Sequence, residues 1–173
     1  MDVLLLSKNA IKIRSKKASL IIDPDKTMPK TPADCVILMD KESDVSKVSD
    51  KRLLVSGPGE YEVGGLKITG ISFGGKTAYD LSDENVSDLF LARASAVENV
   101  SEKVRDYSVA VINADAALNP TLITALEPRL LILYGEKARE GAKLLGKDEF
   151  TVSNKFSFTE DKLMEEMQVV VLE

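Results

Sequence analysis

The sequence predicts an α/β protein in which antiparallel and parallel strands build mixed or facing sheets, with helices packed outside them. Two observations predict this class. Short apolar runs separated by turn residues fill the first two-thirds of the 173-residue chain, whereas strand-like and helix-like segments alternate in the last third. Hydrophobic residues make up 44% of the chain and charged residues 29%, as in ordinary globular proteins. This length suits one domain, residues 1–173, with a hydrophobic core.

The strands expected in the first two-thirds are short and end at turn signals. Ile11 and Ile13 alternate with Lys12 and Arg14, which is the two-residue period of a half-buried strand. Gly64-Gly65 predicts a tight hairpin turn. The expected strands are residues 3–6, 10–14, 18–22, 34–39, 52–56, 60–63, 66–71, 76–81 and 86–92. Residues 24–33 carry three prolines and predict a surface loop, and residues 40–51 suit a short helix or a loop.

The last third has a β-α-β-α rhythm. Asn119 and Pro120 suit the N-cap and the first residue of a helix that runs to about Leu126. Residues 136–145 are amphipathic and are followed by Gly146, a helix stop. The other expected elements are a helix at 97–104, strands at 108–112, 129–133, 155–158 and 168–172, and a helical turn capped by Thr159.

The composition excludes several kinds of catalytic site. The chain has no histidine and one cysteine, Cys35. This excludes Ser-His-Asp and Cys-His nucleophile pairs, and it excludes zinc sites built from histidine or from several cysteines. Cys35 lies in an apolar run, so we expect a buried, unreactive thiol.

Charge and hydropathy narrow the class of partner. The net charge is −5, and the densest basic run, Lys12, Arg14, Lys16 and Lys17, is short enough for a solvated hairpin, so we expect no nucleic-acid partner. No stretch has the form of a signal peptide or a membrane span, so we expect no membrane partner and a cytoplasmic location.

Four stretches of the chain resemble one known family. They are Ile21-Ile22-Asp23-Pro24, Ala33-Asp34-Cys35-Val36-Ile37, Ser56-Gly57-Pro58-Gly59-Glu60-Tyr61-Glu62-Val63-Gly64-Gly65 and Leu126-Glu127-Pro128-Arg129-Leu130-Leu131-Ile132. Together they are similar to the metallo-β-lactamase superfamily, in the branch of zinc-dependent hydrolases related to ascorbate-6-phosphate lactonase. The final Gln168-Val169-Val170-Val171-Leu172 also resembles that branch. The resemblance implies a four-layer αββα sandwich of two mixed sheets with outer helices and an active site on loops at one edge.

The same resemblance implies a first metal loop of the form H-x-H-x-D-H directly after the strand at 34–39. Asp40 and Glu42 stand at its first two histidines, Asp44 stands at its aspartate, and Val45 replaces its last histidine. The family has a histidine after the E-P-R strand, where this chain has Tyr134-Gly135.

The remaining ligand positions implied by the resemblance are changed as well. Ser7-Lys8 replaces a glycine-histidine pair, and residues 89–93 contain neither the histidine nor the aspartate of the intervening metal loop. The sequence therefore predicts a catalytically inactive protein without zinc, in which Asp40, Glu42 and Asp44 are vestigial metal-loop positions.

Two other functions remain open. Asp40, Glu42 and Asp44 could converge on a hard cation such as Mg²⁺ or Ca²⁺ and support a hydrolase, although Lys41 between them opposes this. Residues from Gly70 to Thr77 match the spacing of a phosphate-binding loop, which would require a helix after Thr77. The favoured hypothesis is a structural or protein-interaction domain without a cofactor that binds a protein partner or self-associates.

Overall fold

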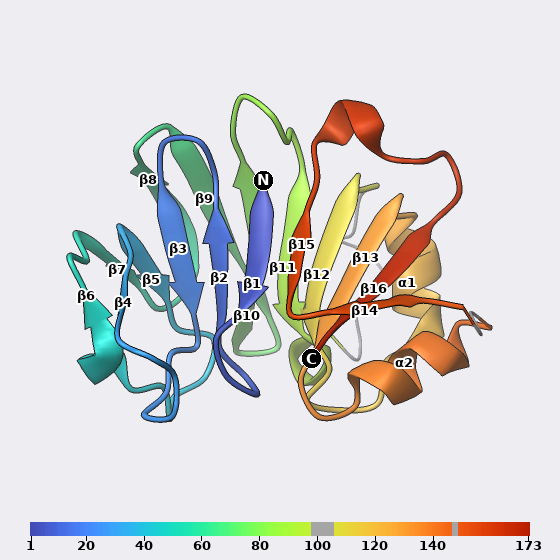
Figure 1. Ribbon diagram of the computed structural model, residues 1–173, viewed down its shortest axis with the longest axis horizontal. Coiled ribbons are helices and arrows are strands. Elements are labelled where there is room, and N and C mark those ends of the chain that lie inside the picture. Colours follow the sequence, from blue (N-terminus) through green and yellow to red (C-terminus); the bar gives the residue numbers. More distant parts are fainter. Residues whose placement is uncertain (98–105, 147–148) are drawn as a thin grey trace.

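The computed structural model describes residues 1–97, 106–146 and 149–173, and two packed sheets form its body (Figure 1). The six-stranded sheet has the order β15-β1-β2-β3-β5-β7. Its strands are β1 (Asp2–Leu5), β2 (Ile11–Arg14), β3 (Ser19–Ile22), β5 (Cys35–Ile37), β7 (Leu53–Val55) and β15 (Lys155–Ser157). Neighbours from β15 to β3 are antiparallel, whereas β3, β5 and β7 are parallel, so this sheet is mixed.

The eight-stranded sheet has the order β14-β16-β13-β12-β11-β10-β9-β8. Its strands are β8 (Gly59–Val63), β9 (Leu66–Phe73), β10 (Lys76–Ser82), β11 (Leu89–Arg93), β12 (Val109–Asn113), β13 (Leu130–Tyr134), β14 (Thr151–Ser153) and β16 (Gln168–Leu172). The strands from β8 to β11 are antiparallel hairpins, and the strands from β11 to β14 along the sheet are parallel. Parallel strands need crossover connections, which explains the helix-like rhythm of the last third.

The main core lies between the two sheets. Alternate side chains of facing strands, such as Ile13, Leu91 and Ile132, are fully buried in one cluster. Burying a side chain of this kind stabilises the fold by about 1.5–3 kcal/mol relative to leaving it in water. Cys35 belongs to this cluster, and burial, together with the Asp34 charge, raises the pKa of its thiol to about 12, as expected of an unreactive cysteine.

The outer faces of the two sheets are covered differently. Helices α1 (Pro120–Leu126) and α2 (Ala138–Leu144) pack on the eight-stranded sheet in a second cluster. The six-stranded sheet is covered by Met28, by the 3₁₀ turn Val45–Lys47 and by the two-residue pair β4 (Thr31–Pro32) and β6 (Val48–Ser49). The sandwich of two mixed sheets with outer helices is thus confirmed, and in the described part of the chain its thinner outer layer is made of loops.

Turn chemistry accounts for much of the agreement with the sequence prediction. Gly64 and Gly65 have φ values of 56° and 80° and join β8 to β9, as expected of a glycine hairpin turn. The side chain of Asn119 accepts a hydrogen bond of 3.0 Å from the Thr121 amide and caps α1. No helix within residues 1–97, 106–146 and 149–173 has the length and apolar content needed to cross a bilayer.

Several expectations differ from the structure. The helix expected after Thr77 by the phosphate-loop alternative is wrong, because Gly74 and Gly75 turn the chain into β10, which begins at Lys76. The strand expected from residue 86 starts at Leu89, because the Asp83 carboxylate accepts hydrogen bonds from the following amides and prolongs the turn.

The C-terminal third departs from the prediction at smaller points. A 3₁₀ turn, Glu160–Lys162, follows Thr159, but Thr159 makes no side-chain capping hydrogen bond. Strand β14 was not predicted, because Thr151 and Val152 are exposed at a sheet edge and show no alternation. The helix expected at 97–104 falls, beyond residue 97, outside the described residues.

Candidate functional site

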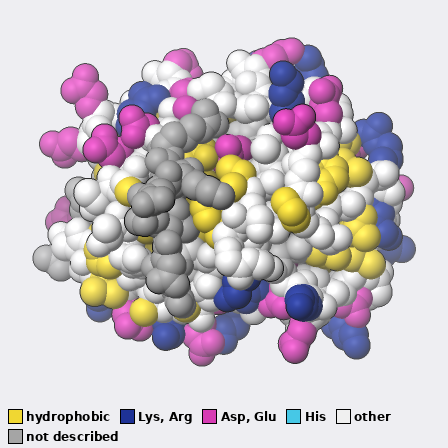
Figure 2. All heavy atoms as spheres, turned by 180° about the vertical axis from the view of Figure 1, so that it is seen from behind, with side chains coloured by type: hydrophobic (Ala, Val, Ile, Leu, Met, Phe, Trp, Pro, Cys, Tyr) yellow, Lys and Arg dark blue, Asp and Glu magenta, His cyan; other side chains and the backbone are white. Residues whose placement is uncertain are grey.

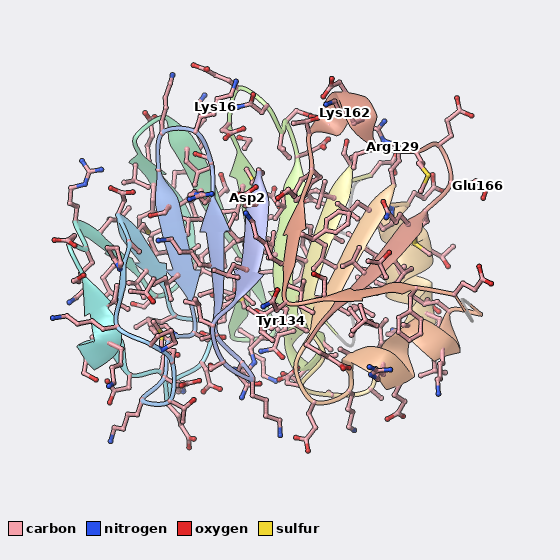
Figure 3. All side chains as sticks on the ribbon, in the orientation of Figure 1. Asp2, Lys16, Arg129, Tyr134, Lys162 and Glu166 are labelled. Carbon is pink, nitrogen blue, oxygen red and sulfur yellow. The ribbon has the colours of Figure 1, made fainter. Side chains whose placement is uncertain are left out.

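Polar side chains gather where strands of the two sheets end. Arg93, Asn113 and Tyr134 are the last residues of the parallel strands β11, β12 and β13 and are direct register neighbours. Asp23 follows β3, and Asp40 follows β5, in the facing sheet. In α/β folds the carboxyl ends of parallel strands form the usual ligand site, because the chain leaves each strand there in a loop. Tyr134 marks this end of the sandwich in Figure 3.

The Arg93 guanidinium is the centre of this group, which we call the strand-end cluster: Asp23, Asp40, Arg93, Asp115 and Ser95. Nε of Arg93 lies 2.9 Å from Oδ2 of Asp115, and Nη1 donates to Oδ2 of Asp40. The same Nη1 lies 3.5 Å from Oδ2 of Asp23. The Arg93 side chain is only 17% exposed, so these contacts are screened little by water.

Asp23 is the most buried carboxylate of the strand-end cluster. Its Oδ1 accepts hydrogen bonds from the amides of Met39 and Asp40, at 2.6 and 2.8 Å, and from the Ser43 hydroxyl at 3.2 Å. The backbone of Asp23 has a φ of 45°, in the left-handed region. Burial raises the pKa of the Asp23 carboxyl above its usual range, against the opposing effect of these hydrogen bonds and of Arg93. Asp23 therefore fixes the loop that begins at Asp40.

The other two carboxylates are held in the charged form. The hydrogen bond from the Glu42 amide, followed by Arg93, lowers the pKa of Asp40. Burial acts to raise the pKa of Asp115, but hydrogen bonds from Ser95 and the charge of Arg93 outweigh it, so that pKa is lowered. The Ser95 amide and hydroxyl bind Asp115 at 3.0 and 2.5 Å. Burial acts to lower the pKa of Arg93, but the hydrogen bonds to Asp40 and Asp115 raise it.

Neutral polar groups on the neighbouring strands have no such partners. The Tyr134 hydroxyl and both side-chain polar atoms of Asn113 are buried without a hydrogen-bond partner, as is Oδ2 of Asp23. Burial raises the pKa of Tyr134 well above its usual range. Gly135, with a φ of 92°, follows Tyr134, and a Cβ at this position would come within 2.3 Å of the Asn113 Oδ1. Only glycine therefore fits beside Asn113.

A hollow of about 370 Å³ opens to solvent next to Arg93. It is lined by Met39, Asp40, Lys41, Glu42, Lys76, Thr77, Arg93, Ser95 and Ala96. The Lys76 ammonium donates to the Ser95 carbonyl at 2.7 Å, so it is held against the wall of the hollow. Ionic side chains of both signs line this hollow, and the most buried of the cations, Arg93, is already paired.

The three vestigial positions predicted from the sequence have different surroundings. The Asp40 carboxylate binds Arg93 and accepts a hydrogen bond from the Glu42 amide, and the exposed Glu42 side chain lines the hollow. Asp44 caps the 3₁₀ turn through the Ser46 amide at 2.8 Å and lies 3.8 Å from Lys26. Among the described residues, no group of three or more His, Cys, Asp or Glu side chains has an arrangement that could hold a metal ion.

Sequence reasoning missed Arg93 as the centre of the site. Its three carboxylate partners are distant in sequence, since Asp40 is 53 residues away and Asp115 is 22 residues away. The available signal was a basic residue directly after the apolar run 89–92, in the stretch where the family resemblance places a metal loop.

Three solved structures resemble this chain along most of its length. A protein from Thermotoga maritima, described as a Zn-dependent hydrolase of the metallo-beta-lactamase superfamily, matches with a TM-score of 0.74 and 16% identity over 100% of this chain and 99% of that chain. An isothiocyanate hydrolase from Delia radicum gut bacteria matches with a TM-score of 0.59 and 10% identity over 92% and 100% of the two chains. Igni18, a metallo hydrolase from Ignicoccus hospitalis, matches with a TM-score of 0.54 and 10% identity over 84% and 90%.

The chain has the metallo-β-lactamase fold. No family model and no curated protein matches the sequence, so the likeness to hydrolases is one of fold. Fold alone does not carry an activity, because one fold supports many functions.

The residues of the strand-end cluster do not fit a zinc ion. The chain has no histidine, and the three carboxylates of the cluster share one guanidinium. The positive charge of that guanidinium would repel a divalent cation. Arg93 therefore supplies the positive charge at the place where the resemblance puts a metal loop.

Proposed function

We propose that this chain is a catalytically inactive protein of the metallo-β-lactamase fold that acts as a structural or protein-interaction domain. The Arg93 guanidinium carries the proposal, because it contacts Asp23, Asp40 and Asp115 together. A hydrolase of this fold needs a metal-bound water, and a permanent side-chain cation provides charge but no exchangeable water.

The strand-end cluster also links the two sheets. Asp23 and Asp40 follow strands of the six-stranded sheet, whereas Arg93 ends β11 and Asp115 follows β12 in the eight-stranded sheet. In this proposal, the ion pairs between these residues cross-link the two sheets and do not form a catalytic site. A protein of this kind retains the loops and edges of the sandwich as surfaces for other proteins.

Metal content tests the proposal directly. We would measure it by mass spectrometry on untagged protein, and then titrate Zn²⁺, Mg²⁺, Mn²⁺ and Ca²⁺ while recording the melting temperature. We expect no stoichiometric metal and no upward shift. A cation that bound the native state would stabilise it by about 2.7 kcal/mol at 100 times its Kd, which the melting temperature would register.

Two variants make the outcome specific. Asp40→Ala/Glu42→Ala/Asp44→Ala removes the acidic loop, and Glu60→Ala/Glu62→Ala/Glu165→Ala removes three exposed carboxylates elsewhere with the same change in charge. A stoichiometric metal, or a shift lost in the first variant and kept in the second, would contradict the proposal. That result would favour a hydrolase that uses a non-zinc cation on Asp40, Glu42 and Asp44.

A further inference from the structure

The outer face of the six-stranded sheet is covered over only part of its width. Over β3 and β5, the side chains of Ile21 and Val36 are buried beneath Met28, Ala33 and Val48. Within the described residues this cover ends at the edge of β2, where the Lys12 ammonium donates to the Pro32 carbonyl, and Figure 1 shows β15, β1 and β2 with no helix lying across them. On the other sheet, α1 and α2 cover the part of the outer face that includes β13 and β16.

A hollow of about 390 Å³ lies on this uncovered part, which we call the β1 face. The hollow is lined by Asp2, Leu4, Leu6, Lys12, Arg14, Pro29, Lys30, Thr31 and Lys155. The alternation of the strands explains this set. Val3, Ile11 and Ile13 point into the core, so the even-numbered neighbours on the paired strands point outward. Leu4 pairs with Lys12 on one side and with Lys155 on the other, and it forms the middle of an apolar floor.

The rim of the β1 face is basic. Lys12, Arg14, Lys30 and Lys155 are four cations, whereas Asp2 is the one carboxylate in the lining, which leaves a local excess of three positive charges. Asp2 is held by Arg14 at 2.6 Å and by Lys155 at 3.3 Å. The whole chain carries a net charge of −5, so this face opposes the overall sign.

The basic run noted in the sequence divides between two surfaces. Lys12 and Arg14 face the hollow, whereas Lys17 pairs with Glu84, and Lys16 lies at the turn beyond the strands (Figure 3). On the opposite side of the molecule, shown in Figure 2, Lys and Arg side chains are interspersed with Asp and Glu around the edge. Of the two surfaces compared, the β1 face is therefore the one whose charged side chains are mainly basic.

The dimensions of the β1 face suit one helix. Three neighbouring strands span roughly 10 Å between the outer two, and four residues of strand extend about 13 Å. An α-helix is about 10–12 Å in diameter with its side chains, and two to three turns match the length. The helices on the other sheet, α1 and α2, are seven residues each and cover their face in the same manner.

We propose that the β1 face binds an acidic amphipathic helix of a partner protein. Apolar side chains of that helix pack on Leu4, Leu6 and Pro29, and its carboxylates meet the surrounding Lys and Arg side chains. This helix would supply, over β1, an outer layer that the described residues of the chain do not provide. The inference rests on the proposed function, since it gives the interaction domain its interface.

The apolar floor favours a helix over a nucleic acid. A phosphate backbone would satisfy the basic rim but would leave Leu4 and Leu6 facing a charged, hydrated chain. An amphipathic helix buries these side chains and pairs the rim at the same time.

A peptide titration tests the inference. The probe is a fluorescently labelled peptide of about 16 residues, end-capped, with leucine at i, i+3, i+4 and i+7 and glutamate along both flanks. The control peptide has lysine in place of each glutamate. Binding is followed by anisotropy in buffer with EDTA, so that no metal contributes. We expect the acidic peptide to bind, with an affinity that falls as salt is added, and the lysine peptide not to bind.

Matched protein variants locate the site. Lys30→Glu/Lys155→Glu reverses two exposed charges of the rim, whereas Lys67→Glu/Lys143→Glu makes the same change at exposed positions outside this hollow. We expect the rim variant to weaken binding about tenfold or more and the control variant to leave it unchanged. Leu4→Gln should weaken binding because it removes apolar surface from the floor of the hollow. The melting temperature of this variant is recorded to confirm that it folds. If the reversed rim does not fold, Lys30→Gln/Lys155→Gln gives the same comparison at a smaller charge change.

Other outcomes would overturn the inference. Equal binding of the lysine peptide, or equal loss in the control variant, would contradict a basic site. Displacement of the peptide by a DNA duplex that itself binds the rim would point to nucleic acid. A dimer in sedimentation that is lost in the rim variant would make a second copy the occupant. Because the titration contains EDTA, a metal cannot affect its result. A failure of the peptide to bind can therefore be distinguished from a failure of the proposed function, which would be seen as a bound metal.

Discussion

The charged groups of the strand-end cluster and the neutral groups beside it differ greatly in how fully their hydrogen-bonding atoms are satisfied. On the charged side, Asp40, Asp115 and Arg93 have short mutual contacts and further hydrogen bonds from Glu42 and Ser95. On the neutral side, the Tyr134 hydroxyl and the Asn113 amide are buried without a partner. The neutral groups are also the more deeply buried, since Asn113 and Tyr134 are fully buried, whereas the Asp40 side chain is 37% exposed.

This difference shows that a buried charge needs a partner more strongly than a buried neutral polar group does. A buried charge without a counter-charge costs several kcal/mol, whereas a buried neutral hydroxyl or amide without a partner costs about 1–3 kcal/mol. A fold can tolerate the second cost more readily than the first. Arg93 supplies the counter-charge for the buried carboxylates. No group in the described part of the chain supplies a hydrogen-bond partner for Tyr134 and Asn113. Three substitutions, in order of expected effect, test this comparison.

Arg93→Ala should have the largest effect. It leaves Asp23, Asp40 and Asp115 facing one another without a cation, so we expect the free energy of unfolding to fall by about 3–5 kcal/mol at neutral pH. Urea denaturation measures this loss. In the variant, unlike the wild type, added Mg²⁺ or Ca²⁺ should restore part of the stability, because the carboxylates then lack their cation.

Arg52→Ala is the matched control for Arg93→Ala. Arg52 also makes a 2.6 Å ion pair, with Asp34, but its side chain is 65% exposed, so its loss should cost no more than about 1 kcal/mol. Equal losses in the two variants would show that the strand-end cluster has no special role in stability.

Asp115→Asn should have an intermediate effect that depends on pH. The pKa values of Asp115 and Asp40 are lowered in the folded protein, so their contribution is present above the unfolded value near 4 and is lost as the pH falls through the folded values. Asp23 acts in the opposite sense, because its raised pKa makes its contribution largest at low pH and smaller as the pH rises through the folded value.

We therefore expect Asp115→Asn to be about 1–3 kcal/mol less stable than wild type at pH 7, with the difference narrowing below about pH 4. Urea denaturation at several pH values from 7 to 3 measures this. Glu62→Gln, at an exposed position on β8, should leave the profile unchanged. A difference that stays constant with pH would mean that Asp115 acts through packing and not through its charge.

Tyr134→Phe should have the smallest effect and the opposite sign. Removal of a buried hydroxyl without a partner should leave the stability unchanged or raise it by up to about 1 kcal/mol. Tyr79→Phe is the control in the same core, because the Tyr79 hydroxyl accepts a 3.0 Å hydrogen bond from the Gly57 amide, and its loss should cost about 1 kcal/mol. A clear loss in Tyr134→Phe, measured by thermal denaturation, would mean that the hydroxyl does have a bound partner in solution.

Local chemistry explains how much of this structure the sequence could predict. Gly64-Gly65, Asn119-Pro120 and the apolar runs before Asp23 and Tyr134 act over a few residues, so the strands and helices that they bound were found. The strand-end cluster depends on pairing across long separations, and no local pattern records which carboxylate will meet Arg93. Asp23 illustrates the limit, since the sequence marks Asp23-Pro24 as a turn, while the structure also uses its carboxylate to hold the Asp40 loop.

The link between β14 and β15 sets an order for assembly. β14 is an outer strand of one sheet and β15 is an outer strand of the other, and Asn154 alone separates them in the chain. β1 pairs with β15, so Val3 reaches its register partner Phe156 only after every residue between them has been made. During synthesis, β1 therefore keeps one edge open until β15 emerges from the ribosome. Such long-range pairing slows folding, and an open edge invites association with other chains, so a nascent copy of this protein is vulnerable to aggregation until β15 has been made.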